Sequence, residues 1–192
     1  MVTQTLFTAF IGALALERCF ELWLSRRNAA WARSAGAVEY GAGHMRWMKL
    51  LHTGFFVAAL AEVWFAGRPF VPALGIPCAV VALLAQALRY WTIATLGPRW
   101  NVAVLVLPGV PAIVGGPFRF LRHPNYVAVV AEGLAVPLLH SAYLTAALFT
   151  ALNAWLLSVR IRCEEDALER HCAYRERLGA RRRFWPAPPG RP

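Results

Sequence analysis

Five long apolar runs constrain the fold of this chain more than any other feature. They cover residues 3–24, 47–66, 70–96, 126–139 and 142–159. The hydrocarbon core of a bilayer is spanned by about 20 apolar residues of helix, which bonds all its backbone groups internally. We therefore predict an all-α integral membrane protein with about five transmembrane helices, of which the fourth is short.

Composition and charge support this class. Of the 192 residues, 58% are hydrophobic and 16% are charged, whereas a soluble domain of this size needs a more polar surface. The net charge of +10 raises the possibility of a nucleic-acid partner. The arginines, however, lie at the ends of apolar runs and in the tail, where they match anionic lipid headgroups. We expect a lipid bilayer as partner and no nucleic acid.

The basic residues also predict an orientation. Segments 25–46 and 97–125 and the stretch from residue 160 onward are rich in arginine, whereas the alternate loops carry Arg68 alone. Cytoplasmic loops carry the excess of Lys and Arg. The pattern predicts a multi-pass protein of the inner (plasma) membrane with its N-terminus outside. The C-terminus and any site built from the basic segments would be cytoplasmic.

One membrane domain, 1–192, accounts for the chain. Residues 1–96 would form three helices, and 97–180 a core with a helical hairpin and a charged tail helix over 160–178. Residues 181–192 would form a basic, Pro-rich tail. Within the core, 101–114 is apolar but holds Pro108, Gly109 and Pro111, so it cannot be a regular helix.

The stretch 116–126, Gly-Pro-Phe-Arg-Phe-Leu-Arg-His-Pro-Asn-Tyr, stands out between apolar runs. Three cationic or titratable side chains among aromatic residues at a membrane edge indicate a site that holds an anion. His123 precedes a proline, which favours an extended residue followed by a helix that begins at Pro124. The alternative is a plain helix start, at which Arg122 and His123 reach lipid phosphates.

A second cluster lies where the fifth run ends. Arg160 and Glu164 are four residues apart and so share one helix face, and two further acidic residues follow at 165 and 166. An exposed ion pair, worth a few tenths of a kcal/mol, is one interpretation. The other is a binding site, because carboxylates accept from hydroxyls such as those of a ribose and an arginine holds a carboxylate bidentately.

Charged residues also lie within the apolar runs. Glu17, Arg18 and Glu21 interrupt the first run, and Glu62 and Arg89 lie alone in later ones. Intramembrane charges usually pair inward, so we expect a polar seam rather than catalysis. The chain has no CxxC or HxxxH spacing and no GxGxxG after a strand, so we expect no metal site and no Rossmann nucleotide site.

Two motifs, taken in order, resemble the isoprenylcysteine carboxyl methyltransferase family. They are Gly116-Pro117-Phe118 with Arg122-His123-Pro124-Asn125-Tyr126 and, after one hairpin, the run from Arg160 to Leu168 that holds Glu164 and Glu165. The resemblance implies an integral membrane methyltransferase (EC 2.1.1 class) that uses S-adenosyl-L-methionine without a Rossmann fold. Residues 97–180 would be its methyltransferase core.

The resemblance also implies roles for individual residues. Arg160 would face the acceptor and, with Arg122, act in catalysis. Phe118 stands where the family often has Tyr, and the Phe-Gly that commonly follows the Glu-Glu helix is missing. The implied cofactor-binding residues are Val110, Pro111, Ala112, Ile113, Phe118, His123, Pro124, Asn125, Tyr126, Glu164 and Glu165.

The acceptor implied by the resemblance is a lipid-tailed small molecule or a prenylated group, methylated on a carboxylate or on an enol or phenol hydroxyl. The first half, through residues such as Arg18, Glu21 and His44, resembles a bacterial subgroup acting on alkylpyrones or alkylresorcinol-type polyketides. Two alternatives stay open: methylation of an amine such as a phospholipid headgroup, and a membrane protein that is not an enzyme.

Overall fold

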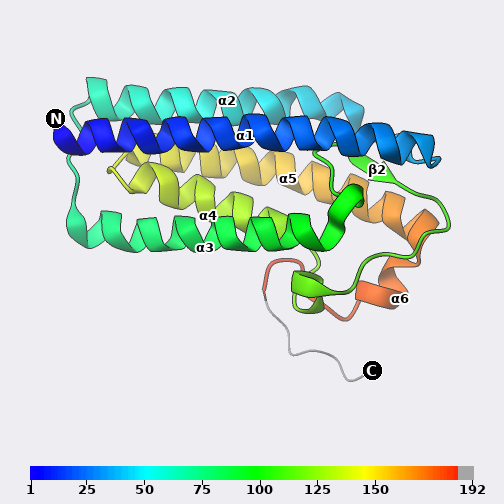
Figure 1. The fold of residues 1–192 in the computed structure, drawn as a ribbon. Coiled ribbons are helices and arrows are strands. Elements are labelled where there is room, and N and C mark those ends of the chain that lie inside the picture. The colour runs from blue at the N-terminus through cyan, green and yellow to red at the C-terminus, as the bar shows by residue number, and fades with distance from the viewer. Residues whose placement is uncertain (186–192) are drawn as a thin grey trace.

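Five long helices lie side by side and form a bundle (Figure 1). The structure, a computed structural model, describes residues 1–185. Successive helices run in opposite directions, and the N-terminus lies at the end of the bundle away from β2 and α6. We call the end with β2 and α6 the basic end. The helices are α1 (Val2–Ser34), α2 (Ala42–Phe65), α3 (Pro72–Leu96), α4 (Pro124–Leu138) and α5 (Tyr143–Cys172).

Short elements connect the long helices. They are the strands β1 (Val38–Tyr40) and β2 (Val104–Val106), the 3-10 turns η1 (Gly97–Arg99) and η2 (Gly116–Arg119), and the helix α6 (Tyr174–Leu178).

Three helical segments are long and apolar enough to cross a membrane: Ala42–Phe65, Pro72–Arg99 and Tyr143–Cys172. The other two long helices fall outside this set. Helix α4 has 15 residues, which is about 22 Å of helix, and α1 carries three charged residues near its middle. The structure thus agrees with a membrane protein of helices, and the crossing of the membrane by α1 and α4 stays a prediction.

The segment 25–46 differs from the loop that we predicted. Helix α1 continues to Ser34, and β1 then pairs antiparallel with β2, with Val38 opposite Val106. The all-α prediction missed this small sheet, because strands of three residues are too short to give a period-two pattern. The sheet ties the connection between α1 and α2 to the irregular segment that follows α3.

The irregular segment 101–114 was predicted correctly, and its backbone is satisfied by the end of α5. The Gly109 amide donates to the His171 carbonyl at 3.0 Å, and the Ala112 amide donates to the Cys172 carbonyl at 3.2 Å. A small second core forms here, at the basic end. Its buried members come from the segment, from α5 and from α6: Val104, Val106, Ala112, Ala167, Cys172, Tyr174 and Leu178.

The tail helix that we predicted over 160–178 is broken. Helix α5 ends at Cys172, Ala173 is left-handed with φ 49°, and α6 turns back so that Tyr174 and Leu178 are buried. No helix-breaking residue stands at this point, so the sequence carried no signal of it. The described part of the predicted basic tail, 181–192, contacts the rest of the fold, because the Arg122 amide donates to the Arg182 carbonyl at 3.0 Å. Residues 186–192 of that tail lie outside the described residues.

The predicted pairing of intramembrane charges is confirmed. Arg18 lies 2.5 Å from Glu21 and 3.1 Å from Glu132, and Arg89 pairs with Glu132 as well. Helices α1, α3 and α4 are thereby joined through buried ion pairs, which hold because each charge has a partner in a low dielectric.

Gly116 allows a close approach between η2 and α3. Its φ is +54°, and a Cβ there would lie 2.2 Å from Thr95 Oγ1. We expect Gly116→Ala to lower the free energy of unfolding by at least about 1 kcal/mol, because it adds both strain and a clash. Thermal unfolding of the detergent-solubilised protein measures this. Gly115→Ala is the matched control, since Gly115 has φ −82° and open space around it; equal losses in the two variants would contradict the account.

Candidate active site

The stretch that links η2 to α4 forms one wall of the candidate site. His123 is 4% exposed, Pro124 starts α4, and the His123 ring stacks on Tyr126 with 5.3 Å between ring centroids. His123 Nε2 lies 2.9 Å from Glu165 Oε1. The interpretation of His123 as a side chain reaching lipid phosphates is therefore wrong: it is buried and bound to a carboxylate of α5.

Glu165 joins three segments that are distant in the sequence. Its carboxylate pairs with Arg122 at 3.4 Å and accepts from Arg183 Nε at 2.9 Å, besides its contact with His123. The tail adds a backbone bond, since the His123 amide donates to the Arg183 carbonyl at 3.3 Å. Charge-assisted bonds of this kind are the strong ones, so Glu165 fixes both the turn and the tail.

Tyr174 closes this wall from α6. Its hydroxyl lies 3.4 Å from His123 Nε2. Burial, with Glu165 and Glu164 nearby, raises the pKa of the Tyr174 phenol well above its ordinary value. The phenol consequently stays protonated at neutral pH and is available as a hydrogen-bond donor.

A hydroxyl separates the two residues of the second predicted cluster. Arg160 Nε donates to the Tyr126 hydroxyl at 2.6 Å, and that hydroxyl donates to a carboxylate oxygen of Glu164. Arg160 Nη2 also donates to the Val102 carbonyl at 2.5 Å. Arg160 and Glu164 share a helix face as predicted, but the interpretation as an exposed ion pair is wrong, because Arg160 is only 7% exposed.

Arg160 is a buried cation held by neutral partners. Within residues 1–185 no carboxylate oxygen lies within salt-bridge distance of its guanidinium, whereas Arg18 and Arg89 have such partners. The Tyr126 ring lies beneath it, 5.7 Å from the guanidinium carbon to the ring centroid. The Glu164 carboxylate is the nearby counter-charge, but it reaches Arg160 only through the Tyr126 hydroxyl. A buried cation without a direct carboxylate partner favours the binding of an anion.

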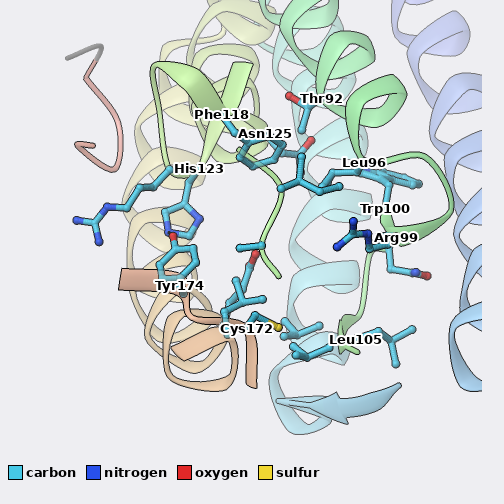
Figure 2. Close-up of a pocket in the computed structure, with 18 of the residues that line it drawn as sticks. Thr92, Leu96, Arg99, Trp100, Leu105, Phe118, His123, Asn125, Cys172 and Tyr174 are labelled. Atoms are coloured by element: carbon cyan, nitrogen blue, oxygen red, sulfur yellow. The ribbon is translucent and has the colours of Figure 1, made fainter. Parts of the chain in front are cut away.

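A cavity of about 160 Å³ lies between these walls; we call it the smaller cavity. Figure 2 shows Thr92, Leu96 and Trp100 on one side of it, and His123 and Tyr174 on the other. Several of its polar atoms are buried and find no hydrogen-bond partner within the described residues, 1–185: Arg122 Nε, Asn125 Oδ1 and Asn101 Nδ2. Unpaired buried polar atoms are costly, so the cavity is suited to a ligand with several polar groups.

The structure brings together most of the predicted site residues. Two of them do not line the smaller cavity. Pro111 is exposed, with its carbonyl accepting from Arg99 Nη1 at 3.0 Å, and Glu165 acts from behind the wall. Those that line it are Val110, Ala112, Ile113, Phe118, Arg122, His123, Pro124, Asn125, Tyr126, Arg160 and Glu164.

Other lining residues were missed from the sequence. Trp100 and Asn101 follow a Gly-Pro pair at a membrane edge, and a polar Asn in that place is a usable signal of a site. Tyr174 gave no signal, since its position depends on the unpredicted break at Ala173. Thr92 and Leu96 of α3 also line the cavity. In the sequence they resemble any apolar helix face, so nothing marked them.

A larger cavity, of about 540 Å³, lies among α1, α2, α4 and α5. Its lining is mostly apolar, and it includes the exposed Cys19 of α1. It shares five residues with the smaller cavity, and we call these the shared wall: Trp100, Asn101, Asn125, Tyr126 and Arg160. A smaller, more polar cavity and a larger, more apolar one thus meet at the buried Arg160.

We expect Glu165→Gln to loosen the tail and the turn together, because a neutral amide loses the charge-assisted bonds to Arg122, His123 and Arg183. The free energy of unfolding should fall by about 1–3 kcal/mol, and the amides of Arg122 and His123 should exchange hydrogen faster. Hydrogen-exchange mass spectrometry and thermal unfolding measure the two effects. Asp166→Asn is the control, since Asp166 is exposed; unchanged exchange in Glu165→Gln would contradict the role of this carboxylate.

Comparison with known proteins places this site in a family. The Isoprenylcysteine carboxyl methyltransferase (ICMT) family matches residues 77–170, which span most of α3 to most of α5. The chain is similar to the uncharacterized protein YpbQ of Bacillus subtilis (strain 168), with 40% identity over 86% of this chain and 98% of that protein. It is also similar to an uncharacterized protein of Haemophilus influenzae, with 28% identity over 79% of this chain and 88% of that protein. This chain belongs to the isoprenylcysteine carboxyl methyltransferase family.

Proposed function

We propose that this protein transfers a methyl group from S-adenosyl-L-methionine to an oxygen of a lipid-tailed acceptor. The acceptor oxygen belongs to a carboxylate or to an enol or phenol hydroxyl. The observation that carries the proposal is the shared wall: a smaller, more polar cavity and a larger, more apolar cavity meet at Arg160 and Tyr126. Membership in a methyltransferase family supports the reaction class.

The residues of the smaller cavity fit the methyl donor. The Arg122 guanidinium, with Nε unpartnered, suits the donor's carboxylate, and the Glu164 carboxylate suits a ribose hydroxyl. Asn125 Oδ1, also unpartnered, offers an acceptor for an amino group. When bound there, the donor supplies a methyl group already activated by a sulfonium, so the protein's main task is alignment.

Arg160 would bind the acceptor oxygen. Within residues 1–185 its buried guanidinium has no carboxylate at salt-bridge distance, and Glu164 is reached only through the Tyr126 hydroxyl, so an acceptor carboxylate or enolate would be its direct anionic partner. The same charge lowers the pKa of a hydroxyl acceptor and favours the anion that attacks the methyl group. An ammonium acceptor would be repelled by it, which favours methylation of oxygen over methylation of an amine.

The larger cavity would hold the lipid tail. Its apolar lining and its position between α1 and α2, where Cys19 is exposed, support access from the lipid phase. The basic segments lie at the same end of the bundle as the donor cavity, which supports an N-terminus outside the inner membrane and a cytoplasmic donor site. A water-soluble donor and a lipid-soluble acceptor would then reach Arg160 and Tyr126 from different phases.

Glu164→Gln should weaken the affinity for S-adenosyl-L-methionine by about tenfold or more, because a carboxylate that accepts from a hydroxyl is replaced by a neutral amide. Isothermal titration calorimetry on the full chain in detergent measures this. Asp166→Asn, two residues away and exposed, should bind as the parent does. No saturable binding to the parent protein would refute the methyltransferase function itself.

Arg160→Ala should lower turnover by about 100-fold or more while donor affinity changes by only a few fold, since the acceptor oxygen loses its cation. Transfer of labelled methyl to extracted membrane lipid measures turnover, and calorimetry measures donor binding and shows that the variant is folded. Arg162→Ala is the control, because Arg162 is exposed and, in the part of the chain that the structure describes, its side chain bonds only to Ser158. Undiminished turnover in Arg160→Ala would contradict the role of Arg160 in binding the acceptor oxygen.

The labelled product identifies the acceptor atom. Label released by mild base indicates a methyl ester, and label that resists base but lies on oxygen indicates a methyl ether. Both outcomes agree with the proposal. Label on nitrogen would establish the amine alternative and contradict the account of Arg160.

A further inference from the structure

The larger cavity has a second polar region, away from the shared wall. One face of α4 lines the cavity along its length, and on it Glu132 follows Tyr126 by six residues. At 1.5 Å per residue, Glu132 lies about 9 Å further along the bundle. We call this region the far polar site; its members are Arg18, Glu21, His52, Arg89 and Glu132, all of which line the larger cavity.

Much of the far polar site holds the helices together. Arg18 bonds to Glu21 at 2.5 Å and to Glu132 at 3.1 Å, and Gln86 accepts from Arg18 at 3.1 Å. Glu17 belongs to the same ion network, through Gln86 and Arg18, but does not line the cavity. Glu17 Oε1 accepts no hydrogen bond within residues 1–185 although it lies outside the cavity, so an unpaired oxygen alone does not mark a ligand site. Glu21 differs because it lines the cavity.

Two acceptor atoms of the far polar site lack a donor. Glu21 is 5% exposed, and its Oε1 accepts no hydrogen bond; the nearest cationic atom, Arg89 Nε, is 3.7 Å away. The second atom belongs to His52. Its Nδ1 lies 2.8 Å from the Met48 carbonyl, which can only accept, so Nδ1 carries the proton and Nε2 is left as an acceptor. No hydrogen bond from residues 1–185 reaches that nitrogen.

His52 and Glu132 lie at the same depth in the cavity. The His52 ring meets the Phe149 ring edge-on at 5.4 Å. Phe149 in turn lies against Gly133, where its ring would touch any added Cβ. Gly133 is the neighbour of Glu132 on α4, so an acceptor molecule extending from Arg160 along the cavity would pass between His52 and the ion network.

The unpaired acceptor atoms of this site favour a ligand group that is a neutral hydrogen-bond donor. Glu21 and His52 offer acceptors, so a plain methylene chain beside them would leave both desolvated and unpartnered. A cationic hydrogen-bond donor is disfavoured, because four basic residues line the cavity: Arg18, Lys49, Arg89 and Arg160. A hydroxyl donates one hydrogen bond, to Glu21 or to His52, without adding charge. Beyond the site the lining becomes apolar again, with Leu14, Phe55 and Val136.

We propose that the acceptor is not a plain hydrocarbon-tailed oxyacid but carries a hydroxyl set back from the methylated oxygen, which binds at the far polar site before the apolar tail continues. This inference rests on the proposed methyltransferase function and adds a second recognition point to it. Arg160 would select the atom to be methylated, and Glu21 with His52 would select the molecule.

The test compares acceptors that differ only in this hydroxyl. The full chain in detergent, supplied with S-adenosyl-L-methionine, is given hexadecanoic acid and an alkylphenol with a tail of equal length. Each is used unsubstituted, with a mid-chain hydroxyl, and with a hydroxyl at the tail end. We expect the mid-chain hydroxyl to raise kcat/KM by about tenfold or more over both other forms for the head group that is methylated, since the site's free acceptors discriminate against its absence.

Two variants test whether His52 and Glu21 cause the preference for the mid-chain hydroxyl. His52→Phe keeps the ring shape and removes Nε2, and Glu21→Gln keeps the length and removes the charge. In at least one of the two variants the ratio of kcat/KM for the mid-chain hydroxyl over the unsubstituted chain should fall toward one. The ratio is measured on one protein, so losses of folded protein cancel. Glu17→Gln is the matched control: it alters the same ion network from outside the cavity and should leave the ratio and the donor affinity at parental values.

The outcomes separate this inference from the function on which it rests. The parent protein could methylate the unsubstituted chains with a kcat/KM ratio, hydroxylated over unsubstituted, near one. That result overturns the second recognition point and leaves the methyltransferase function intact. A ratio that survives in both His52→Phe and Glu21→Gln also overturns it. No transfer to any of these probes, with either head group, counts against the oxygen-methylating function, and the inference falls with it.

Discussion

A buried guanidinium with only neutral partners is the feature around which the site is organised. Arg160 is held by the Tyr126 hydroxyl and the Val102 carbonyl. These partners come from α4 and from the irregular segment, so one cation ties together the three parts of the chain that meet at the shared wall. Because its charge is not neutralised by a carboxylate at salt-bridge distance within residues 1–185, the same residue that fixes the geometry favours an anionic oxygen next to it.

The Glu165 carboxylate holds the segments around Arg160 in place. Glu164 receives the Tyr126 hydroxyl, whereas its neighbour Glu165 binds the turn and the tail. Adjacent residues on a helix point about 100° apart, so two consecutive glutamates serve two different surfaces. Residues that touch a ligand are thereby separated from residues that hold them in position, an arrangement that keeps binding groups precise.

The sequence predicted the parts of the site that depend on local rules. Hydropathy placed the helices, the proline rule placed the start of α4 at Pro124, and helix spacing placed Arg160 and Glu164 on one face. It did not predict the features that depend on distant contacts. The β1–β2 sheet needs residues 38–40 to meet 104–106, and the break at Ala173 follows from burial of Tyr174 rather than from any local signal. The larger cavity is likewise invisible in a sequence, since it depends on how four helices are spaced.

The charges inside the apolar runs show both what the sequence predicts and what it does not. Their inward pairing followed from the cost of an isolated charge in lipid, and the ion pairs of Arg18 and Arg89 confirm it. That Glu132 would be the common partner could not be predicted, because nothing in its own run marks it as facing α1 and α3. The far polar site therefore emerged only from the three-dimensional arrangement.

The most direct test of the account is an experimental structure of the protein with S-adenosyl-L-homocysteine, the product form of the donor. The account predicts that this ligand occupies the smaller cavity, against Arg122 and Glu164, with its sulfur directed to the shared wall at Tyr126 and Arg160. A ligand bound at any other surface, or a smaller cavity that stays empty at saturating ligand, would contradict it.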